Sequence, residues 1–292
     1  MYPSLSNLVY ALTGFELRLP IPTFTFFLIV AALTGYWLLF SEVKRKENKR
    51  IMSGCYNSKG KYISPSRQVW TIAFIALTYG LIGSRLFPII ADPAPFYEAP
   101  LYTLFSSQGS VFFGGLILAL ITVAIYANSR RLKLVHLLDA AAPALTLAYA
   151  VGRFGCYISG DWMCGINNNL EKPSWLSIMP DWLWVYKNNP AEIDITPIFP
   201  TQLYEACICV LIFLVLWSLR KSAIPGMVFS LYLLFYGLER FFIEQLRIED
   251  NHEMIHLFFK QAQTISLIMV LMGCLTVYVS RRNYKNKFSY LQ

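Results

Sequence analysis

The sequence has few charged residues, only three histidines, and no motif for a nucleotide, zinc or serine-esterase site. Charged residues make up 14% of its 292 positions, whereas soluble domains carry about 25%. Neither a P-loop, a zinc-ligand spacing nor a G-x-S-x-G stretch is present. We therefore expect no metal site and no cofactor. The first residues also lack a basic stretch followed by a small-residue cleavage site, so no cleaved signal peptide is expected.

Long apolar runs are present instead. Residues 22–41 and 262–280 contain no charge, and several other runs reach the roughly 20 residues needed to cross a bilayer. A β-barrel would show short alternating strands. We therefore predict an all-α polytopic membrane protein that forms a single integral-membrane domain, residues 1–292. Seven transmembrane helices are expected at about 22–41, 68–91, 110–127, 136–152, 201–219, 226–245 and 262–280.

The net charge of +8 lies mainly on alternate connections between these spans. Loops 42–67 and 128–135, the turn after residue 219 and the C-terminal tail hold 17 of the 25 lysines and arginines. The positive-inside rule places these segments in the cytoplasm, with the N-terminus outside and the C-terminus inside. The basic residues are thus topology signals, and no nucleic-acid partner is expected.

Two segments are expected on the outer face of the membrane. Residues 1–21 are predicted to lie on the surface as an amphipathic segment. Residues 153–200 form the large insertion and are predicted to be an extracytoplasmic cap. Its tryptophans and tyrosines suit either a cap at headgroup level or an ordinary hydrophobic cluster.

The stretch VGRFGCYISGDWMCG at residues 151–165 places Arg153 where an apolar helix is expected to end. Arginine is costly at membrane depth, so its presence there needs a reason. A fixed guanidinium beside glycine-exposed backbone N–H groups can hold a phosphate. The other interpretation is a snorkelling arginine before a turn. Gly160 and Asp161 follow in the same stretch.

Several charged side chains remain inside the predicted spans after the loop charges are set aside. An unpaired charge at the bilayer centre costs roughly 2.5–3.5 kcal/mol, so we expect these groups to face one another. At 1.5 Å per residue, Arg240 lies about 21 Å beyond Gly226, in the outer half of the membrane. Two interpretations are open, namely ion pairs that hold helices together and a cationic cavity for a phospholipid headgroup. The group consists of Arg85, Arg153, Glu205, Glu239, Arg240 and Glu244.

The sixth predicted span carries an ordered polar face. Tyr236, Arg240 and Glu244 recur every four residues, and the spacing of Arg240 and Glu244 favours an ion pair. Glu239 points about 100° away from this face. We therefore expect it to pair with a residue outside this face.

Two further features belong to other spans. Pro200 suits the first turn of a helix, which puts Gln202 and Glu205 at its outer end, where the helix dipole favours an acid. The glycine pair Gly114–Gly115 allows close backbone approach by another helix or by an acyl-glycerol.

Two residue pairs have interpretations that spacing does not decide. His252 and His256 share a face in the last outer loop, where a solvated surface pair and a contact to a headgroup or metal are both open. Cys156 and Cys164 both lie outside and are candidates for a disulfide.

Three stretches, GRFGCYISGD, FPTQLYE and YGLERFFIEQLR, occur in this order and together resemble the prolipoprotein diacylglyceryl transferase family. With the glycine pair and the seven spans, the resemblance covers nearly the whole chain. It implies an enzyme of the bacterial cytoplasmic (inner) membrane with its active site towards the outer leaflet. Such an enzyme moves the diacylglyceryl group of phosphatidylglycerol to the lipobox cysteine thiol of a prolipoprotein. A thioether forms and glycerol-1-phosphate is released.

The resemblance also implies roles for individual residues. The expected catalytic residues are Arg240, Glu205, Glu244 and Tyr236. The expected phosphatidylglycerol-binding residues are Arg153, Arg85, Gly114, Gly115, Gly160, Asp161 and Gln202.

The chain departs from the family at Phe113 and Phe199, where many members have histidine. This departure leaves the general base open between Glu244, Glu205 and water. A non-catalytic phospholipid-binding or scaffold protein of the same fold is the alternative function. A small-solute transporter is disfavoured because no inverted repeat is found.

Overall fold

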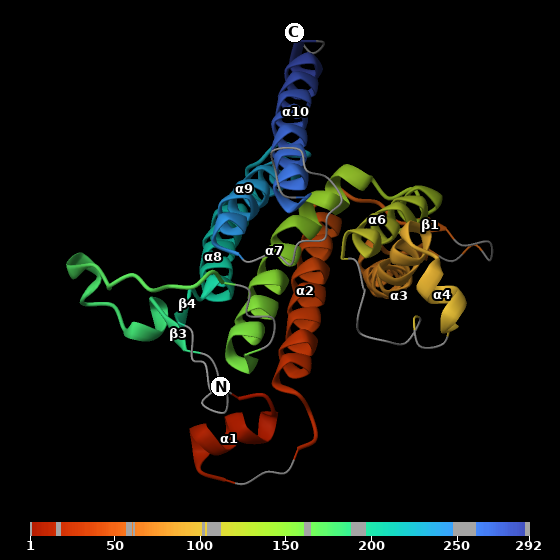
Figure 1. Cartoon of the computed structure of the whole chain (residues 1–292). Coiled ribbons are helices and arrows are strands. Elements are labelled where there is room, and N and C mark those ends of the chain that lie inside the picture. The colour runs from red at the N-terminus through yellow and green to blue at the C-terminus, as the bar shows by residue number, and fades with distance from the viewer. Residues whose placement is uncertain are drawn as a thin grey trace. The chain divides into compact units, whose positions relative to one another are not determined.

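The computed structural model is mainly helical, and its contacts divide the chain into two units (Figure 1). The first unit comprises residues 1–38 and 138–292, and the second comprises residues 39–137. Helices α2 (Thr23–Asn48) and α7 (Leu134–Ser159) contribute to both. The structure describes residues 2–15, 19–56, 60, 62–100, 103, 112–160, 165–187, 197–247 and 261–289.

Each of the seven predicted spans coincides with a helix. Five helices are long and apolar enough to cross a membrane, namely residues 23–48, 65–90, 134–159, 201–219 and 263–285. The other two are shorter: α6 (Phe112–Ser129) has 18 residues and α9 (Met227–Ile243) has 17. The chain is therefore a helical, polytopic membrane protein, as expected, whereas the number of crossings stays a prediction.

Helix α7 extends beyond the fourth predicted span. It continues to Ser159, so Arg153 lies inside a helix and residues 153–159, which were expected in the cap, are helical. Gly155 does not interrupt the helix, because its missing side chain serves close packing: a Cβ there would clash with the side chain of Phe27 on α2. The helix ends instead at Gly160, whose φ of 84° is a conformation that glycine adopts readily.

In the rest of the first unit, α9 packs against both α8 and α10. Helices α8 (Thr201–Leu219) and α9 meet in an apolar cluster that includes Ile212, Leu216 and Val228, with Ala142 of α7. Helix α10 (Gln261–Ser289) approaches α9 at Gly237, where a Cβ would lie 2.9 Å from the backbone oxygen of Ser266. In Figure 1 the blue helices α9 and α10 and the blue-green α8 can be followed in this part of the fold.

A buried aspartate joins the beginning of α9 to α7. Asp139 Oδ2 accepts a hydrogen bond from the Gly226 N–H at 2.7 Å, and Oδ1 accepts one from the Phe229 N–H at 3.0 Å. The first N–H groups of a helix have no partner within the helix, so this carboxylate caps α9 from a neighbouring helix. Asp139 was not among the charges expected inside the spans.

The N-terminal segment forms α1 (Leu5–Thr13), capped by the side chain of Ser4. The Tyr2 N–H donates to the Ile158 oxygen at 3.2 Å, so the beginning of the described chain lies at the end of α7. Tyr10 and Leu12 of α1 are exposed apolar side chains. Such a helix is compatible with the predicted surface segment, whose membrane contact stays a prediction.

The described part of the cap is made of short elements: η1 (Ser174–Leu176), η2 (Asp181–Leu183), β3 (Tyr186–Lys187) and β4 (Pro197–Ile198). Strands β3 and β4 pair antiparallel. The Tyr157 hydroxyl of α7 donates to the Trp182 oxygen at 3.1 Å, and the Tyr204 hydroxyl of α8 donates to the Leu183 oxygen at 2.8 Å. These two hydrogen bonds connect this segment to the end of α7 and to the beginning of α8.

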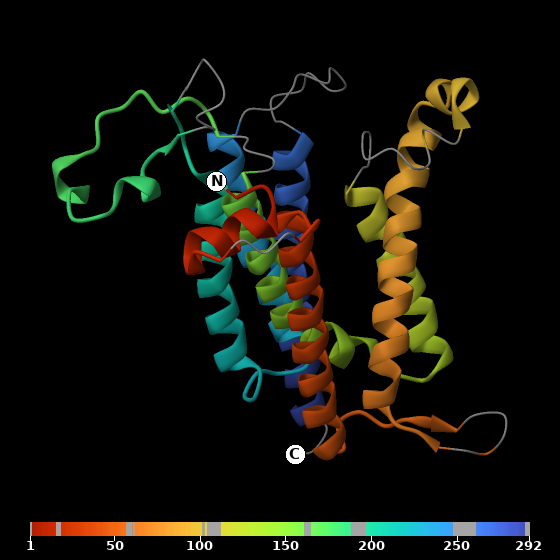
Figure 2. The same ribbon diagram turned by 90° about the horizontal axis from the view of Figure 1, so that it is seen from below.

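The second unit contains β1 (Cys55–Tyr56), β2 (Tyr62–Ile63), α3 (Pro65–Ala91), α4 (Ala94–Glu98) and α6. Figure 2 shows α3 and α6 side by side. A Cβ on Gly83 would lie 2.5 Å from the Gly114 oxygen, and one on Gly115 would lie 2.5 Å from the Gly80 oxygen. The glycine pair thus serves the close approach of another helix, one of the two interpretations of its sequence.

Candidate active site

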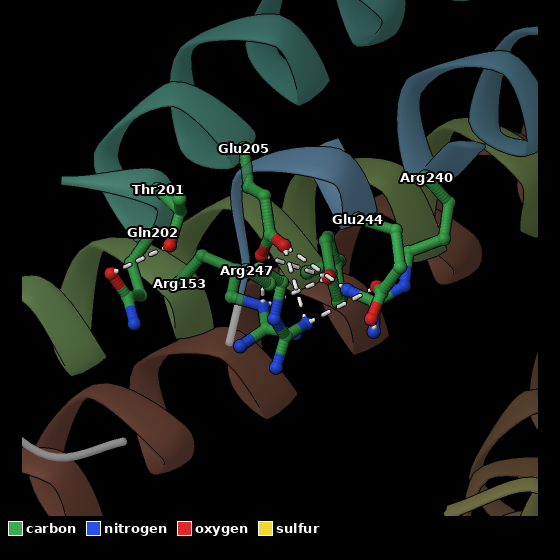
Figure 3. A network of polar contacts seen from close by, with 8 residues as sticks. Arg153, Thr201, Gln202, Glu205, Arg240, Glu244 and Arg247 are labelled. Carbon is green, nitrogen blue, oxygen red and sulfur yellow. Dashed lines mark hydrogen bonds and ion pairs between the residues drawn. The ribbon is translucent and has the colours of Figure 1, made fainter. Parts of the chain in front are cut away.

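Glu205 of α8 is the centre of a buried polar network in the first unit (Figure 3). Its side chain is 1% exposed. Oε2 lies 2.5 Å from Arg153 Nε, and Oε1 lies 3.1 Å from Arg240 Nη1 and 3.6 Å from Arg247 Nη1. One carboxylate therefore meets three guanidinium groups that come from different parts of the chain.

Tyr149 adds a second contact between α7 and α8. Its hydroxyl accepts from Arg153 Nε at 2.8 Å and donates to Glu205 Oε2 at 3.1 Å. The Arg153 guanidinium also lies 5.0 Å from the centre of the Tyr149 ring, within range of a cation–π contact. Because the two residues are one helical turn apart, α7 itself fixes the direction of the guanidinium.

The predicted ion pair on α9 is confirmed. Arg240 Nη2 lies 3.2 Å from Glu244 Oε2, and Arg247 Nη1 lies 3.9 Å from the same oxygen. Tyr236, one turn before Arg240, packs its ring edge against the ring of Tyr149 with centroids 5.3 Å apart. The polar face expected from the spacing of these residues therefore points at α7.

Backbone pairing holds the end of α9 against the beginning of α8. Residues 165–167 run between them: Gly165 bridges to Arg247, and the Ile166 N–H donates to the Leu246 oxygen at 3.0 Å. The Phe199 N–H, just before α8, donates to the Ile166 oxygen at 3.1 Å. A Cβ on Gly165 would clash with the Phe199 oxygen, so only glycine allows this approach.

The charges of the network do not cancel. Three guanidinium groups face two carboxylates, which leaves one excess positive charge. The carboxylates of Glu205 and Glu244 are each 1% exposed, whereas Arg153, Arg240 and Arg247 are 17–19% exposed. The acids therefore lie behind the arginines, and the accessible side of the network is cationic. Such a surface suits a phosphate group, which guanidinium binds with paired N–H donors.

The structure brings together some of the predicted site residues but not all of them. Arg153, Glu205, Tyr236, Arg240 and Glu244 meet in one network. Gln202, one turn before Glu205, is 2% exposed, and its Oε1 lies 3.3 Å from Thr201 Oγ1.

Other predicted residues are not tested by this network. Arg85, Gly114 and Gly115 belong to the second unit. Gly160 ends α7. Asp161, Cys164, His252, His256 and the side chain of Phe113 lie outside the described residues. The question of a disulfide between Cys156 and Cys164, which spacing left open, is therefore not tested.

Two members of the network were missing from the predicted site. Tyr149 lies four residues before Arg153, and Arg247 lies three residues after Glu244. Helical spacing alone could have indicated both. Glu239 was expected to pair elsewhere, but this expectation is wrong: within the described chain, neither of its buried carboxylate oxygens has a hydrogen-bond partner.

The family of this chain follows from its similarity to known proteins. A family model described as prolipoprotein diacylglyceryl transferase matches residues 13–279. The chain belongs to the prolipoprotein diacylglyceryl transferase family. Members of this family are transferases of lipoprotein biosynthesis.

Individual relatives carry the full enzyme name, phosphatidylglycerol–prolipoprotein diacylglyceryl transferase. The protein of Leptospira interrogans (strain Fiocruz L1-130) is 27% identical over 288 residues, covering 86% of each chain. That of Clostridium novyi (strain NT) is 34% identical over 76% of this chain and 82% of its own length. That of Clostridioides difficile (strain 630) is 31% identical over 75% and 81%. The similarity to diacylglyceryl transferases thus extends over both units.

Proposed function

We propose that this chain transfers the diacylglyceryl group of phosphatidylglycerol to the cysteine thiol in the lipobox segment of a prolipoprotein. The sulfur forms a bond to C3 of the diacylglyceryl unit as the bond from C3 to the phosphate oxygen breaks. The electron pair of the broken bond stays on the leaving glycerol-1-phosphate, and the thiol gives up its proton. The observation that carries the proposal is the convergence of three arginines on the buried Glu205 in a member of the transferase family.

The excess charge of the network supports this reaction. A phosphodiester carries one negative charge, which equals the one positive charge left by three arginines and two glutamates. Charge on the leaving phosphate grows as the ester bond breaks, and preorganised donors stabilise such developing charge. Arg153, Arg240 and Arg247 are the groups assigned to the phosphate, because their guanidiniums form the accessible side of the network.

Glu205 and Glu244 are assigned a different task. Both are held by arginines in ion pairs, so their first role is to fix the direction of the guanidinium groups. Tyr149 and Tyr236 support the same arrangement through the hydroxyl contact and the ring contact between α7 and α9.

The remaining predicted residues are proposed to bind phosphatidylglycerol. They are Arg85, Gly114, Gly115, Gly160, Asp161 and Gln202. Arg85 and the glycine pair are assigned to this role by the resemblance of the sequence to the family.

We further propose seven membrane crossings in a bacterial inner membrane, with the N-terminus and the cap outside and the C-terminus inside. The distribution of 17 basic residues on alternate connections supports this orientation. A reporter fused after Lys287 should be cytoplasmic, and one inserted near Asn188 should be extracytoplasmic. The opposite labelling by a membrane-impermeant thiol reagent would overturn the orientation and the outer-leaflet site.

Transfer itself can be measured with purified protein in vesicles. Phosphatidylglycerol with a labelled diacylglyceryl group is mixed with a lipobox peptide, and the thioether product is detected by mass. We expect product with the cysteine peptide and none with a serine peptide. Restored lipidation in a strain depleted of its own transferase is the matching test in cells. Binding of phosphatidylglycerol without thioether formation in either assay would favour a non-catalytic lipid-binding protein.

A further inference from the structure

Glu239 of α9 is an exception among the buried acids. It is 4% exposed, and both carboxylate oxygens are buried and have no hydrogen-bond partner among the residues that the structure describes. The other buried acids of the described chain all have partners: Glu42 pairs with Arg45, Asp139 caps α9, and Glu205 and Glu244 pair with arginines. Buried polar groups without partners are rare in folded proteins, and each needs an explanation.

Glu239 directly precedes Arg240 on α9, although it is not one of the residues that pair in the network. Its charge interacts with those of Glu205 on α8, Arg153 on α7, Arg240 beside it and Arg247 beyond α9. The other titratable groups near it are Cys209 on α8, Tyr149 on α7, and Tyr232 and Tyr236 on α9. On α10, which packs against α9, Cys274 and Tyr278 are exposed to the surroundings.

The reaction proposed above needs a group that takes the proton of the thiol. The carboxylates of Glu205 and Glu244 are already engaged in ion pairs with arginines. A carboxylate buried without a partner has a high free energy, which proton uptake relieves. Among the buried acids of the described residues, Glu239 is the one with both oxygens unused.

We propose that Glu239 is the proton acceptor for the attacking thiol. This inference rests on the proposed function. The S–H bond of the precursor cysteine breaks, and its proton passes to the Glu239 carboxylate over one hydrogen bond or one intervening water. The sulfur electron pair forms the bond to C3, and the pair of the C3–O bond leaves on the phosphate oxygen. Glu239 later releases its proton to water, which restores the carboxylate.

The test compares two peptides with one variant. Glu239→Gln keeps the size of the side chain but cannot accept a proton. With the cysteine peptide we expect single-turnover transfer to fall by about 10²–10⁴-fold, the usual contribution of a general base. With a selenocysteine peptide, whose selenol is already ionised at neutral pH, we expect a loss of less than tenfold. Asp181→Asn, which changes an exposed acid of the cap, is the control and should leave both rates unchanged.

A second variant separates chemistry from folding. Glu239→Asp keeps a carboxylate and should retain more cysteine transfer than Glu239→Gln at equal thermal stability. The acid limb of the wild-type pH–rate profile should also be absent with the selenocysteine peptide. Equal losses with both peptides, or unchanged cysteine transfer by Glu239→Gln, would overturn the assignment. Failure of the wild-type protein to transfer to either peptide would instead contradict the proposed function.

Discussion

Arg153 Nε lies 2.5 Å from Glu205 Oε2, and this contact joins α7 to α8 at the centre of the polar network. The arginine is partly accessible, whereas the glutamate is buried. The glutamate therefore holds the inner side of the guanidinium, and the outer side is available to an anion.

The first prediction concerns Arg153. Arg153→Lys keeps the charge but loses the paired N–H donors that bind two phosphate oxygens. Removing one comparable transition-state donor costs about 2.7–4 kcal/mol, or 10²–10³ in rate. We expect single-turnover transfer to fall by that factor in Arg153→Lys and further in Arg153→Ala. Melting curves should show folded protein in both cases. Near-normal transfer by Arg153→Ala would remove this arginine from the mechanism.

A second prediction concerns the counter-charge. Glu205→Gln leaves three arginines around a neutral side chain, and breaking a buried ion pair costs about 3–5 kcal/mol. We expect a clear loss of stability, measured by thermal or denaturant unfolding in detergent. The matched control is Asp181→Asn, which removes the 3.0 Å pair with Lys172 in the cap. Its carboxylate is 95% exposed, so the change should be below about 1 kcal/mol. Equal effects of the two variants would contradict the central role of Glu205.

A third prediction concerns the capping of the N-terminus of α9 by Asp139. Asp139→Ala removes the acceptor of two N–H groups at the start of the helix that carries Arg240. Loss of a helix cap costs about 0.5–2 kcal/mol. We expect a lower melting temperature, with partial recovery in Asp139→Asn, which keeps one acceptor oxygen. A melting temperature of Asp139→Ala equal to that of the wild type would mean that neighbouring groups accept these hydrogen bonds in place of the carboxylate.

A fourth prediction uses two glycines in helices. A Cβ on Gly83 would lie 2.5 Å from the Gly114 backbone oxygen, whereas a Cβ on Gly152 would meet nothing within 4 Å. Gly83→Ala should therefore destabilise the protein by about 1–3 kcal/mol, as overpacking does. Gly152→Ala should be neutral or stabilising by about 0.5–1 kcal/mol, because alanine favours a helix. Unfolding of both variants by denaturant gives the comparison, and the reverse order would argue against the close α3–α6 crossing.

Much of the helical fold could be predicted from local sequence. The span 201–219 matches α8 at both ends because Pro200 comes just before the helix and apolar residues fill it. The end of α7 was missed because Gly152 and Gly155 look like a helix end in the sequence. Only the contact of Gly155 with α2 reveals that it is a packing position.

The site could be predicted in part. Arg240 and Glu244 are on one helix, so their spacing was sufficient to pair them. The contact of Glu205 with three arginines depends on how α7, α8 and α9 are rotated against each other, which spacing within one helix does not determine. The same is true of Asp139, whose partners are 87 and 90 residues away.

The order of the network along the chain has a consequence for membrane insertion. Arg153 enters the membrane with α7, before α8 brings Glu205, and until then Tyr149 is its available partner on the same helix. Helix α9 then delivers Arg240 together with Glu244, the acid that it pairs with. Arg153 already balances the charge of Glu205 when α7 and α8 meet, and this later part of the chain adds the contacts of Arg240 and Arg247 with the same carboxylate. The complete set of contacts around Glu205 can therefore form only after the last of its partners, Arg247, has been made.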